Sequence, residues 1–207
     1  MDGKAAHSND PVTTADSADA VIRQLRRELD MVRRDNRVLK IAVAELERVA
    51  ERDTLTPLYN RRFFITALHQ RIARAVGAGG CATLVCVDIN QLRAINERHG
   101  HAAGDFALIE IAQRLAGAIR SGDIAARIGG DEFGLILDDM TAADARHQAD
   151  RFARVLQDVP IIFDGEPIGV TACFGIATLE SGMTESDVLA AADHAMDRAK
   201  STERVAA

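Results

Sequence analysis

The run from Ala20 to Arg52 constrains the fold of this chain more than any other segment. It holds no glycine or proline, and its apolar residues recur at spacings of three and four. Written as heptads, the a positions are Ile22, Leu29, Asn36, Val43 and Ala50, and the d positions are Leu25, Val32, Leu39 and Leu46. Apolar residues sustained at a and d are typical of a coiled coil, so we expect one long helix over residues 20–52 that pairs with another helix.

The polar residues in and beside this seam favour a parallel pair of identical chains. Asn36 occupies an a position, where a buried amide can bond to its counterpart in a two-stranded coil. Residues at g and e would pair with opposite charge across the dimer: Glu28 with Arg33, and Asp35 with Lys40. We therefore expect a homodimer through residues 22–50. The alternative is an amphipathic helix that packs against its own domain.

The rest of the chain divides into a polar lead-in and one domain of ordinary size. Residues 1–19 are small, polar and aperiodic, which predicts a disordered lead-in. Residues 53–207 are enough for one domain with a buried core, since 47% of the whole chain is apolar. Cys81, Cys86 and Cys173 lie in apolar contexts, and we interpret them as buried thiols.

Charge and hydropathy argue against two broad classes of partner. The formal net charge is −6 and tryptophan is absent, so we do not expect a nucleic-acid polymer to bind. No apolar run approaches the roughly 18 to 20 residues that a helix needs to cross a bilayer. The N-terminus also lacks the apolar region of a signal peptide. We therefore expect a cytoplasmic protein without a membrane partner.

The pattern of apolar residues in the domain predicts an α/β fold. Helical spacing marks residues 61–76, 91–98, 105–120, 142–158 and a last helix that starts at 184 or 186 and runs to 200. Strand-like runs mark residues 81–88, 124–128, 133–137, 161–163 and 168–178, with loops at 77–80 and 100–105. This order favours a central mixed sheet, mainly antiparallel, flanked by helices. A doubly wound nucleotide fold is not expected, because the chain has no GxGxxG or Walker phosphate loop.

The stretch RIGGDEFGLIL, residues 127–137, places two glycines and two carboxylates at the tip of a predicted hairpin. Another carboxylate, Asp88, ends an apolar strand. If the two strands are neighbours, Asp88 and Asp131 meet at one edge of the sheet, where a divalent cation would relieve their repulsion. Mg²⁺ suits one or two carboxylates that substrate phosphates complete. Gly129 and Gly130 would let the chain turn tightly and let a ligand approach. The alternative is a hairpin tip with solvated acidic residues.

Several separated motifs resemble the GGDEF family of diguanylate cyclases. The signature is Gly129-Gly130-Asp131-Glu132-Phe133, and it is supported by DTLTPLYNRR (53–62), VDINQLRAINERHGHAAGD (87–105) and AADHAMDRAK (191–200). The resemblance covers residues 53 to about 204. It implies a nucleotidyl-cyclase, palm-like catalytic domain over residues 53–207, after the coiled coil.

The family condenses two GTP molecules into cyclic di-GMP and releases two pyrophosphates, and the resemblance implies this activity here. Asp88 and Asp131 match its Mg²⁺ ligands, with the backbone carbonyl of Ile89 as a third. Mn²⁺ is an alternative ion. Glu132 matches the residue that helps to deprotonate the attacking 3′-hydroxyl.

The resemblance also implies how GTP is held. Asn96 and Asp105 match the guanine readers, and a carboxylate can accept from guanine N1–H and N2–H₂, which adenine does not offer. Three cations would surround the triphosphate, and two backbone positions at a helix start would cradle its β- and γ-phosphates. These are Arg93, Lys200 and Arg204, with Gln91 and Leu92. Without the resemblance, Asn96 would be a helix-surface residue, Asp105 an N-cap and the cations surface charges.

A second site is implied on the side of the domain away from the catalytic edge. Arg120-Ser121-Gly122-Asp123 matches the family's RxxD product site, and Arg151 matches an arginine that binds the same ligand from a neighbouring domain. An arginine can grip a guanine edge or a phosphate with two bonds. The implied behaviour is inhibition by a cyclic di-GMP dimer that holds the domains apart. The alternative is a helix-end arginine beside a turn aspartate.

The chain also departs from the family's usual pattern. Asn90 stands in place of a frequent Asp, and Leu92 and Arg93 stand where Phe and Lys are usual. The usual motif after Lys200 is altered, so the final strand is expected to be short. No predicted metal ligand or guanine reader is lost, and we therefore favour an active cyclase. The alternatives are a sensor of GTP or cyclic di-GMP that signals through the coil, and a cyclase with another product. The sequence does not identify the signal that controls activity. The alternatives are a regulatory partner at residues 1–50, product feedback and protein concentration.

Overall fold

The computed structural model describes residues 11–78 and 81–206, without the side chains of residues 11–19, 44, 48, 75–78 and 202–206. The chain consists of two compact units, Met1–Ala50 and Glu51–Ala207.

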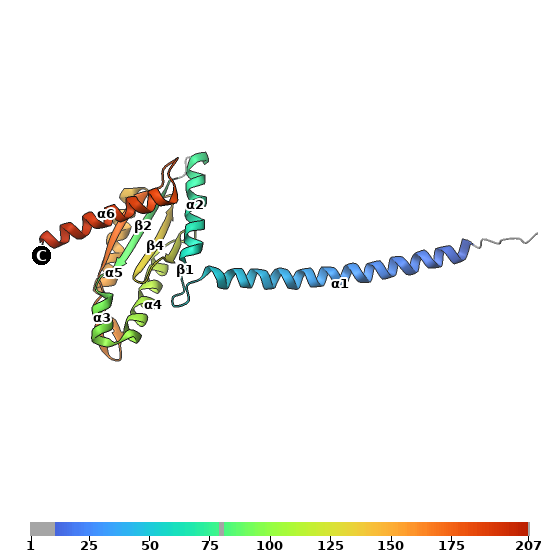
Figure 1. Cartoon of the computed structure of the whole chain (residues 1–207), viewed down its shortest axis with the longest axis horizontal. Helices are drawn as coiled ribbons and strands as arrows, with labels where there is room; N and C mark the ends of the chain where they lie inside the picture. The colour runs from blue at the N-terminus through green and yellow to red at the C-terminus, as the bar shows by residue number, and fades with distance from the viewer. Residues whose placement is uncertain (1–10, 79–80, 207) are drawn as a thin grey trace, which may run out of the picture. The chain divides into compact units, whose positions relative to one another are not determined.

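Helix α1 (Pro11–Glu51) contains all the described residues of the first unit (Figure 1). Its uninterrupted course confirms the long helix that the heptads predict. The helix begins earlier than expected, because residues 11–19 are helical although their composition predicts disorder. Pro11 suits the first turn of a helix, where its missing N–H would have no partner, and residues 12–19 contain no glycine or further proline. The remainder of the predicted lead-in, residues 1–10, lies outside the described residues.

The heptad seam of α1 is exposed in the single chain. The seven large apolar residues at its a and d positions have exposed fractions between 45% and 69%. They are Ile22, Leu25, Leu29, Val32, Leu39, Val43 and Leu46. An apolar stripe of this length is unfavourable in water unless a partner surface covers it. The dimer through residues 22–50 remains a prediction.

The second unit is built on a five-stranded sheet in the order β1-β3-β4-β2-β7. These strands are β1 (Tyr59–Asn60), β2 (Ala82–Ile89), β3 (Ile124–Arg127), β4 (Glu132–Asp138) and β7 (Ala172–Thr178). β1 runs parallel to β3, and every other neighbouring pair in the sheet is antiparallel. This confirms the mixed, mainly antiparallel sheet. β1 has only two residues, too few to show a period of two, so the sequence does not predict it.

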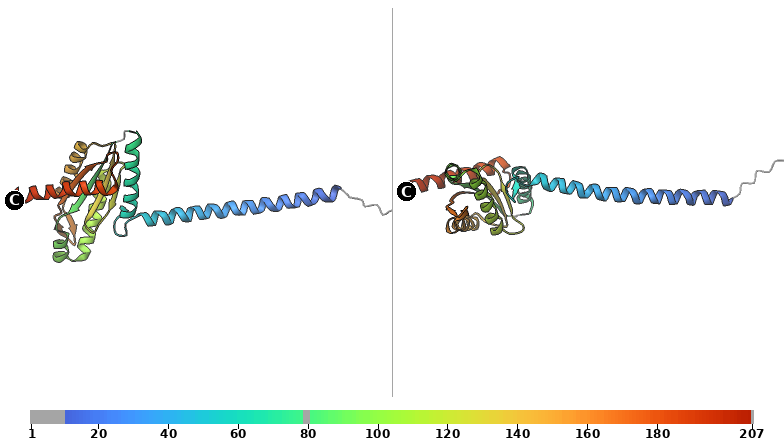
Figure 2. Two further views of the ribbon diagram at one scale, coloured as in Figure 1. Left: turned by 45° about the horizontal axis from the view of Figure 1, so that its top comes forward. Right: turned by 90° about the horizontal axis from the view of Figure 1, so that it is seen from below.

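Helices cover both faces of this sheet (Figure 2). The helices are α2 (Arg61–Ala78), α3 (Leu92–His99), α4 (His101–Ala118), α5 (Ala142–Asp158) and α6 (Glu185–Ala206). Successive side chains of a strand point to opposite faces. Accordingly Val85 and Val87 pack into one core with α3, α4 and α5. Leu84 and Cys86 pack into another core with α2 and α6. Because β2 is buried on both faces, its residues form a nearly continuous apolar run.

The strand predicted over residues 168–178 is divided in two. β5 (Ile161–Phe163) and β6 (Glu166–Ile168) form a separate hairpin, whereas β7 joins the main sheet beside β2. Gly169 lies between them, and a glycine inside a strand pattern commonly marks such a bend.

The loop predicted over residues 100–105 is wrong, because α4 already begins at His101. Only Gly100, with a φ of 85°, separates α3 from α4. Gly104 therefore lies inside a helix, where a Cβ would meet the Asn96 side-chain oxygen at 1.9 Å. The glycine reflects close packing of two helices and not a turn. Asp105 is consequently not the N-cap of α4.

The last helix continues past its predicted end. Thr184 and Asp187 bond reciprocally at the start of α6, as in a capping box, which fixes where the helix begins. Residues 201–206 remain helical, so the short final strand predicted after Lys200 does not form. The side chain of Arg204 lies outside the described residues. Within residues 11–78 and 81–206, no helix is both long and apolar enough to cross a membrane.

Candidate active site

Six of the residues predicted to bind substrate or metal line one cavity of about 570 Å³ between α3, α4 and the β3–β4 hairpin. They are Leu92, Arg93, Asn96, Asp105, Gly130 and Asp131. The cavity exists because α3 and α4 follow each other with only Gly100 between them. This close succession carries the side chains of Asn96 and Asp105 to the same opening.

Asn96 lines this cavity and carries an unsatisfied polar group, which lies next to Gly104 of α4. Its side-chain oxygen is buried and has no hydrogen-bond partner within the described part of the chain. A buried acceptor without a donor costs about 1–3 kcal/mol, which a ligand N–H group could recover. Asp105 is exposed on the neighbouring helix, and its carboxylate is a pure acceptor when ionised. Together the two side chains offer acceptors to a ligand rich in N–H donors.

The turn between β2 and α3 exposes backbone N–H groups beside the cavity. Gln91 adopts a left-handed conformation, with a φ of 60°, and forms no side-chain cap for α3. The first N–H groups of a helix have no partner within the helix, so an uncapped start is suited to an anion. Arg93 projects from the first turn of α3 and forms an ion pair with Glu97, 2.8 Å from Nε to Oε1. At 91% exposure this arginine is free to exchange partners.

Three other predicted site residues, Asp88, Glu132 and Lys200, lie on the α6 side of the same strand ends. Asp88 at the end of β2 is directly opposite Glu132 of β4, and its Oδ1 is 3.1 Å from Nζ of Lys200. Partial burial works to lower the pKa of Lys200. The hydrogen bond and the charge of Asp88 outweigh this effect and raise the pKa above its ordinary value of 10.5. Lys200 therefore stays protonated and offsets the negative charge of these neighbouring carboxylates.

The hairpin tip itself is held close to the end of β2. The N–H of Ile89 donates to the carbonyl of Asp131 at 3.0 Å, which places the two predicted metal-binding segments side by side. Gly129 is needed for a reason that the sequence analysis did not foresee. A Cβ at this position would meet the Glu132 carboxylate at 2.3 Å, so the glycine makes room for that side chain. At Gly130 a Cβ would have no neighbouring atom within 4 Å, and this open position leaves space for a ligand.

The donor atoms at this edge fit a hard divalent cation. Asp88, Asp131 and the carbonyl of Ile89 supply oxygen only, which is the ligand type that Mg²⁺ and Mn²⁺ prefer. Over the described residues, no three His, Cys, Asp or Glu side chains gather into a complete metal cage. Such a small protein donor set agrees with Mg²⁺, which usually keeps water and substrate oxygens as its other ligands.

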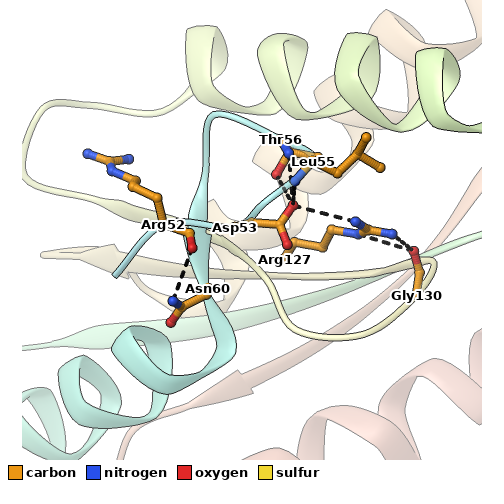
Figure 3. A network of polar contacts seen from close by, with 7 residues as sticks. All are labelled: Arg52, Asp53, Leu55, Thr56, Asn60, Arg127 and Gly130. Atoms are coloured by element: carbon orange, nitrogen blue, oxygen red, sulfur yellow. Dashed lines mark hydrogen bonds and ion pairs between the residues drawn. The ribbon is translucent and has the colours of Figure 1, made fainter. Parts of the chain in front are cut away.

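Arg127 is a site residue to which the sequence analysis assigned no role. Its guanidinium lines the cavity and donates to the carbonyl of Gly130 at 2.7 Å and 3.2 Å. It also reaches Asp53 at 3.4 Å, so the start of the domain is tied to the hairpin tip (Figure 3). The signal available in the sequence was an arginine two residues before the paired glycines. His101 and Glu97 also line the cavity and were not predicted.

Asp53 is itself held by several donors to one oxygen. It accepts from the N–H and hydroxyl of Thr56, both at 2.8 Å, and from the N–H of Leu55 at 3.2 Å. Burial works to raise the pKa of Asp53, but the bonds from Thr56, the charge of Arg127 and the bond from Leu55 outweigh it. The pKa is therefore below its ordinary value of 3.8.

The predicted product site lies at the turn before β3. One oxygen of Asp123 accepts from the N–H of Arg120 at 2.9 Å, and the other accepts from the N–H of Asp138 at 3.0 Å. Asp123 thus has a structural role in the free protein. The side chain of Arg120 is exposed. Arg151, on α5, is exposed and donates to Gln148 at 3.1 Å. None of these three residues lines the cavity between α3 and α4.

The architecture and motifs have a counterpart among known families. Residues 50–206 match the family described as "Diguanylate cyclase, GGDEF domain". The chain belongs to the GGDEF family. The diguanylate cyclase TpbB of Pseudomonas aeruginosa is 36% identical to this GGDEF chain over 159 residues, which are 76% of this chain and 37% of TpbB. The diguanylate cyclase DgcP of the same organism is 31% identical over 179 residues, 86% of this chain and 27% of DgcP. The GGDEF chain thus spans well under half the length of these relatives.

Two solved structures extend the similarity over most of the chain. The coiled coil and GGDEF domain of DgcB from Caulobacter crescentus, solved in complex with c-di-GMP, covers 92% of this chain and 94% of its own at 25% identity and a TM-score of 0.70. The diguanylate cyclase SiaD from Pseudomonas aeruginosa, solved with its activator SiaC, covers 92% of this chain and 74% of its own at 28% identity and a TM-score of 0.74.

Proposed function

We propose that this GGDEF chain is a diguanylate cyclase that condenses two GTP molecules into cyclic di-GMP and two pyrophosphates. The observation that carries the proposal is the cavity that Asn96, Asp105, Gly130 and Asp131 line together, with an Asn96 side-chain oxygen that has no partner among the described residues. Guanine offers N1–H and N2–H₂ donors to such acceptors, whereas adenine offers only its N6–H₂ group. The base would therefore occupy the α3–α4 side, and the triphosphate would extend toward the hairpin tip.

In the proposed reaction the 3′-hydroxyl of one GTP attacks the α-phosphorus of the other. Glu132 assists removal of the hydroxyl proton, a new P–O bond forms, and the bond from the α-phosphorus to the bridging oxygen breaks to release pyrophosphate. A second attack, with the roles of the two nucleotides exchanged, closes the ring of cyclic di-GMP and releases the second pyrophosphate. Lys200 and Arg93 supply positive charge toward the phosphates, and the N–H groups at the start of α3 orient them.

Asp88, Asp131 and the Ile89 carbonyl would hold Mg²⁺. The ion would supply charge stabilisation to the triphosphate and the departing pyrophosphate. Lys200 would then be available to phosphate oxygens, because the ion would also offset the charge of Asp88.

Each domain holds one GTP, so two domains must face each other for reaction. The seam of α1 would provide this proximity, because pairing two chains raises the effective concentration of one half-site near the other. A cytoplasmic location, where GTP is available, stays a prediction. The SiaD structure contains an activator; a corresponding partner for residues 1–50 of this chain is likewise a proposal.

The direct test is incubation of the purified chain with GTP and Mg²⁺, followed by chromatography of the products. We expect cyclic di-GMP and pyrophosphate from the parent. Glu132→Gln should lower kcat by about 100-fold or more, because a general base contributes roughly that factor, while GTP binding persists. Asp88→Ala should lower turnover and weaken the dependence on Mg²⁺.

The matched control is Glu180→Gln, which neutralises an exposed carboxylate outside the site and should leave turnover unchanged. Undiminished turnover in Asp88→Ala would show that the metal assignment is wrong. A parent that binds GTP without turning it over would favour the alternative function, a sensor of GTP or cyclic di-GMP that signals through α1. Formation of a different nucleotide product would favour the remaining alternative, a cyclase with a product other than cyclic di-GMP.

A further inference from the structure

We propose that Asn90 is a positioning residue for the triphosphate. With Thr171 and Cys173 it forms a clasp, here called the Asn90 clasp, that fixes the turn at residues 89–92. The inference rests on the proposed function, since it concerns how that turn presents its N–H groups to the β- and γ-phosphates of GTP.

The Asn90 clasp consists of three hydrogen bonds between the turn and the start of β7. The backbone N–H of Asn90 donates to the carbonyl of Thr171 at 2.9 Å, and its side-chain Nδ2 donates to Thr171 Oγ1 at 3.0 Å. The thiol of Cys173 donates to Asn90 Oδ1 at 3.4 Å. The pairing of β2 with β7 ends at Ile89 and Ala172. The clasp therefore continues this contact one residue beyond the sheet.

The turn needs an external restraint because its backbone is strained. Gln91 has a φ of 60° and a ψ of 24°, a conformation that costs a residue other than glycine about 1 kcal/mol or more. Such a residue persists only where its surroundings hold it. No side-chain cap bond fixes the start of α3. The residue that precedes Gln91 is Asn90, and its three bonds are thus placed where they can hold the strained turn.

Packing does little to support the turn from its outer side. A cavity of about 290 Å³ lies there, lined by Asn90, Gln91 and Thr171 together with residues of α3 and of the segment around β6. Because this side of the turn is open, the polar bonds of the clasp carry more of the restraint. Loosening them would let the N–H groups at the start of α3 move away from the phosphates. Misplacement by about 1 Å can cost a large factor in phosphate binding and rate.

The amide of Asn90 suits this place because it is neutral. Cys173, its donor, is the strand partner of Asp88, so the clasp lies next to a predicted metal-binding carboxylate. An amide both donates and accepts, as the two observed side-chain bonds require. A carboxylate at position 90 could accept from the Thr171 hydroxyl and the thiol, but it would add negative charge beside Asp88 and the triphosphate.

The test compares ligands with and without the outer phosphates on the full chain. Isothermal titration would use a GTP analogue with a methylene group between the α- and β-phosphorus, with Mg²⁺, and separately GMP. For Asn90→Ala and Thr171→Val we expect the Kd of the analogue to rise about tenfold, which corresponds to about 1.4 kcal/mol. The Kd of GMP should stay within about twofold. In turnover assays the KM for GTP should rise more than kcat falls.

Conservative changes separate positioning from folding. Thr171→Ser keeps the hydroxyl and should recover most of the affinity for the analogue that Thr171→Val loses. Asn90→Asp should keep the clasp but bind the analogue more weakly than the parent. Because Thr171 is exposed, its substitution should leave the melting temperature nearly unchanged. Thr66→Val, on the surface of α2, is the matched control for a lost hydroxyl.

The outcomes are distinct. Unchanged affinity for the analogue in both variants, with a parent that binds it well, overturns the inference and leaves the proposed function intact. Equal weakening of the analogue and of GMP also overturns it, because a general loss of structure would then explain the effect. A parent that binds neither ligand overturns the proposed function and the inference together.

Discussion

Asn96 and Asp105 illustrate how much single residues depend on their neighbours in space. Their types identify them as hydrogen-bonding groups, but their joint access to one cavity depends on Gly104, whose missing side chain accommodates the Asn96 oxygen. A methyl group there would collide with that oxygen. The guanine specificity that we propose is thus a property of three residues on two helices.

Asp53 is the residue whose protonation is most clearly linked to stability. Asp53→Asn removes the charge that Arg127 faces at 3.4 Å and should lower the free energy of unfolding by about 1–3 kcal/mol near neutral pH. Because the pKa of Asp53 is lowered in the folded state, its stabilising contribution is present above 3.8 and is lost as the pH falls through the folded-state value. The difference between parent and variant should therefore shrink below about pH 4.

Urea unfolding of both proteins from about pH 6 to about pH 3 measures this difference. Glu180→Gln, an exposed carboxylate that loses its charge, is the control and should show no such gap. A parent–variant difference that is independent of pH would contradict the assignment of the effect to the charge of Asp53.

At the scale of elements, the shape of the β3–β4 hairpin depends on contacts with distant residues, whereas the helical structure of α1 follows from its own sequence. The hairpin tip is shaped by contacts from outside it, because Ile89 binds its Asp131 carbonyl and Arg61 donates to its Ile128 carbonyl at 3.2 Å. Helix α1 is specified along its own length by the seam and by the absence of helix breakers. Its exposed apolar stripe is the feature on which the predicted dimer rests.

Charged residues introduced into the seam of α1 should dissociate the predicted dimer. Leu25→Lys combined with Leu39→Lys places four charges in the dimer's interior, two from each chain, and burial of unpaired charge is costly. We expect monomers by analytical ultracentrifugation and at least a tenfold fall in specific activity at micromolar protein. Gln24→Lys combined with Val38→Lys adds the same charge at outward-facing c positions and should leave the dimer intact. Full activity in proven monomers would remove the role proposed for α1.

At the scale of the whole molecule, the proposed substrate cavity and the predicted product site occupy different parts of the domain. Asp123 is already bonded to backbone N–H groups of Arg120 and Asp138, so its removal would disturb the β3–β4 region as well as any ligand contact. The side chain of Arg120 is exposed and is therefore the better probe of regulation.

Arg120→Ala should raise the concentration of cyclic di-GMP needed for half-inhibition at least tenfold, because a two-bond arginine contact of this kind contributes about 1.5–3 kcal/mol. Initial turnover without product and the melting temperature should stay close to those of the parent. Arg154→Ala, which removes an exposed arginine of α5, is the control. Inhibition that is equally strong in Arg120→Ala would show that the RxxD segment forms the turn before β3 but does not bind the product.

Local patterns were sufficient for much of the fold and for the choice of candidate site residues. The heptads predict α1 because this signal is contained within a few turns of chain. The start of α5 is equally local, since the Thr141 side chain caps it by accepting from the N–H of Asp144. The literal GGDEF signature identifies the family for the same reason. The central sheet follows from apolar runs whose period does not depend on distant residues.

Only the tertiary structure decided the features that depend on contacts between distant segments. It placed Gly104 inside α4 against Asn96, although a glycine after His101 and two alanines resembles a loop in sequence. It divided residues 161–178 between two sheets, since strand partners are chosen in space. It also joined Asn90 to Thr171, 81 residues later in the chain. Helix signals are local and survive without partners, whereas cavity shape, strand partnership and side-chain pairing arise only when separated parts of the chain pack together.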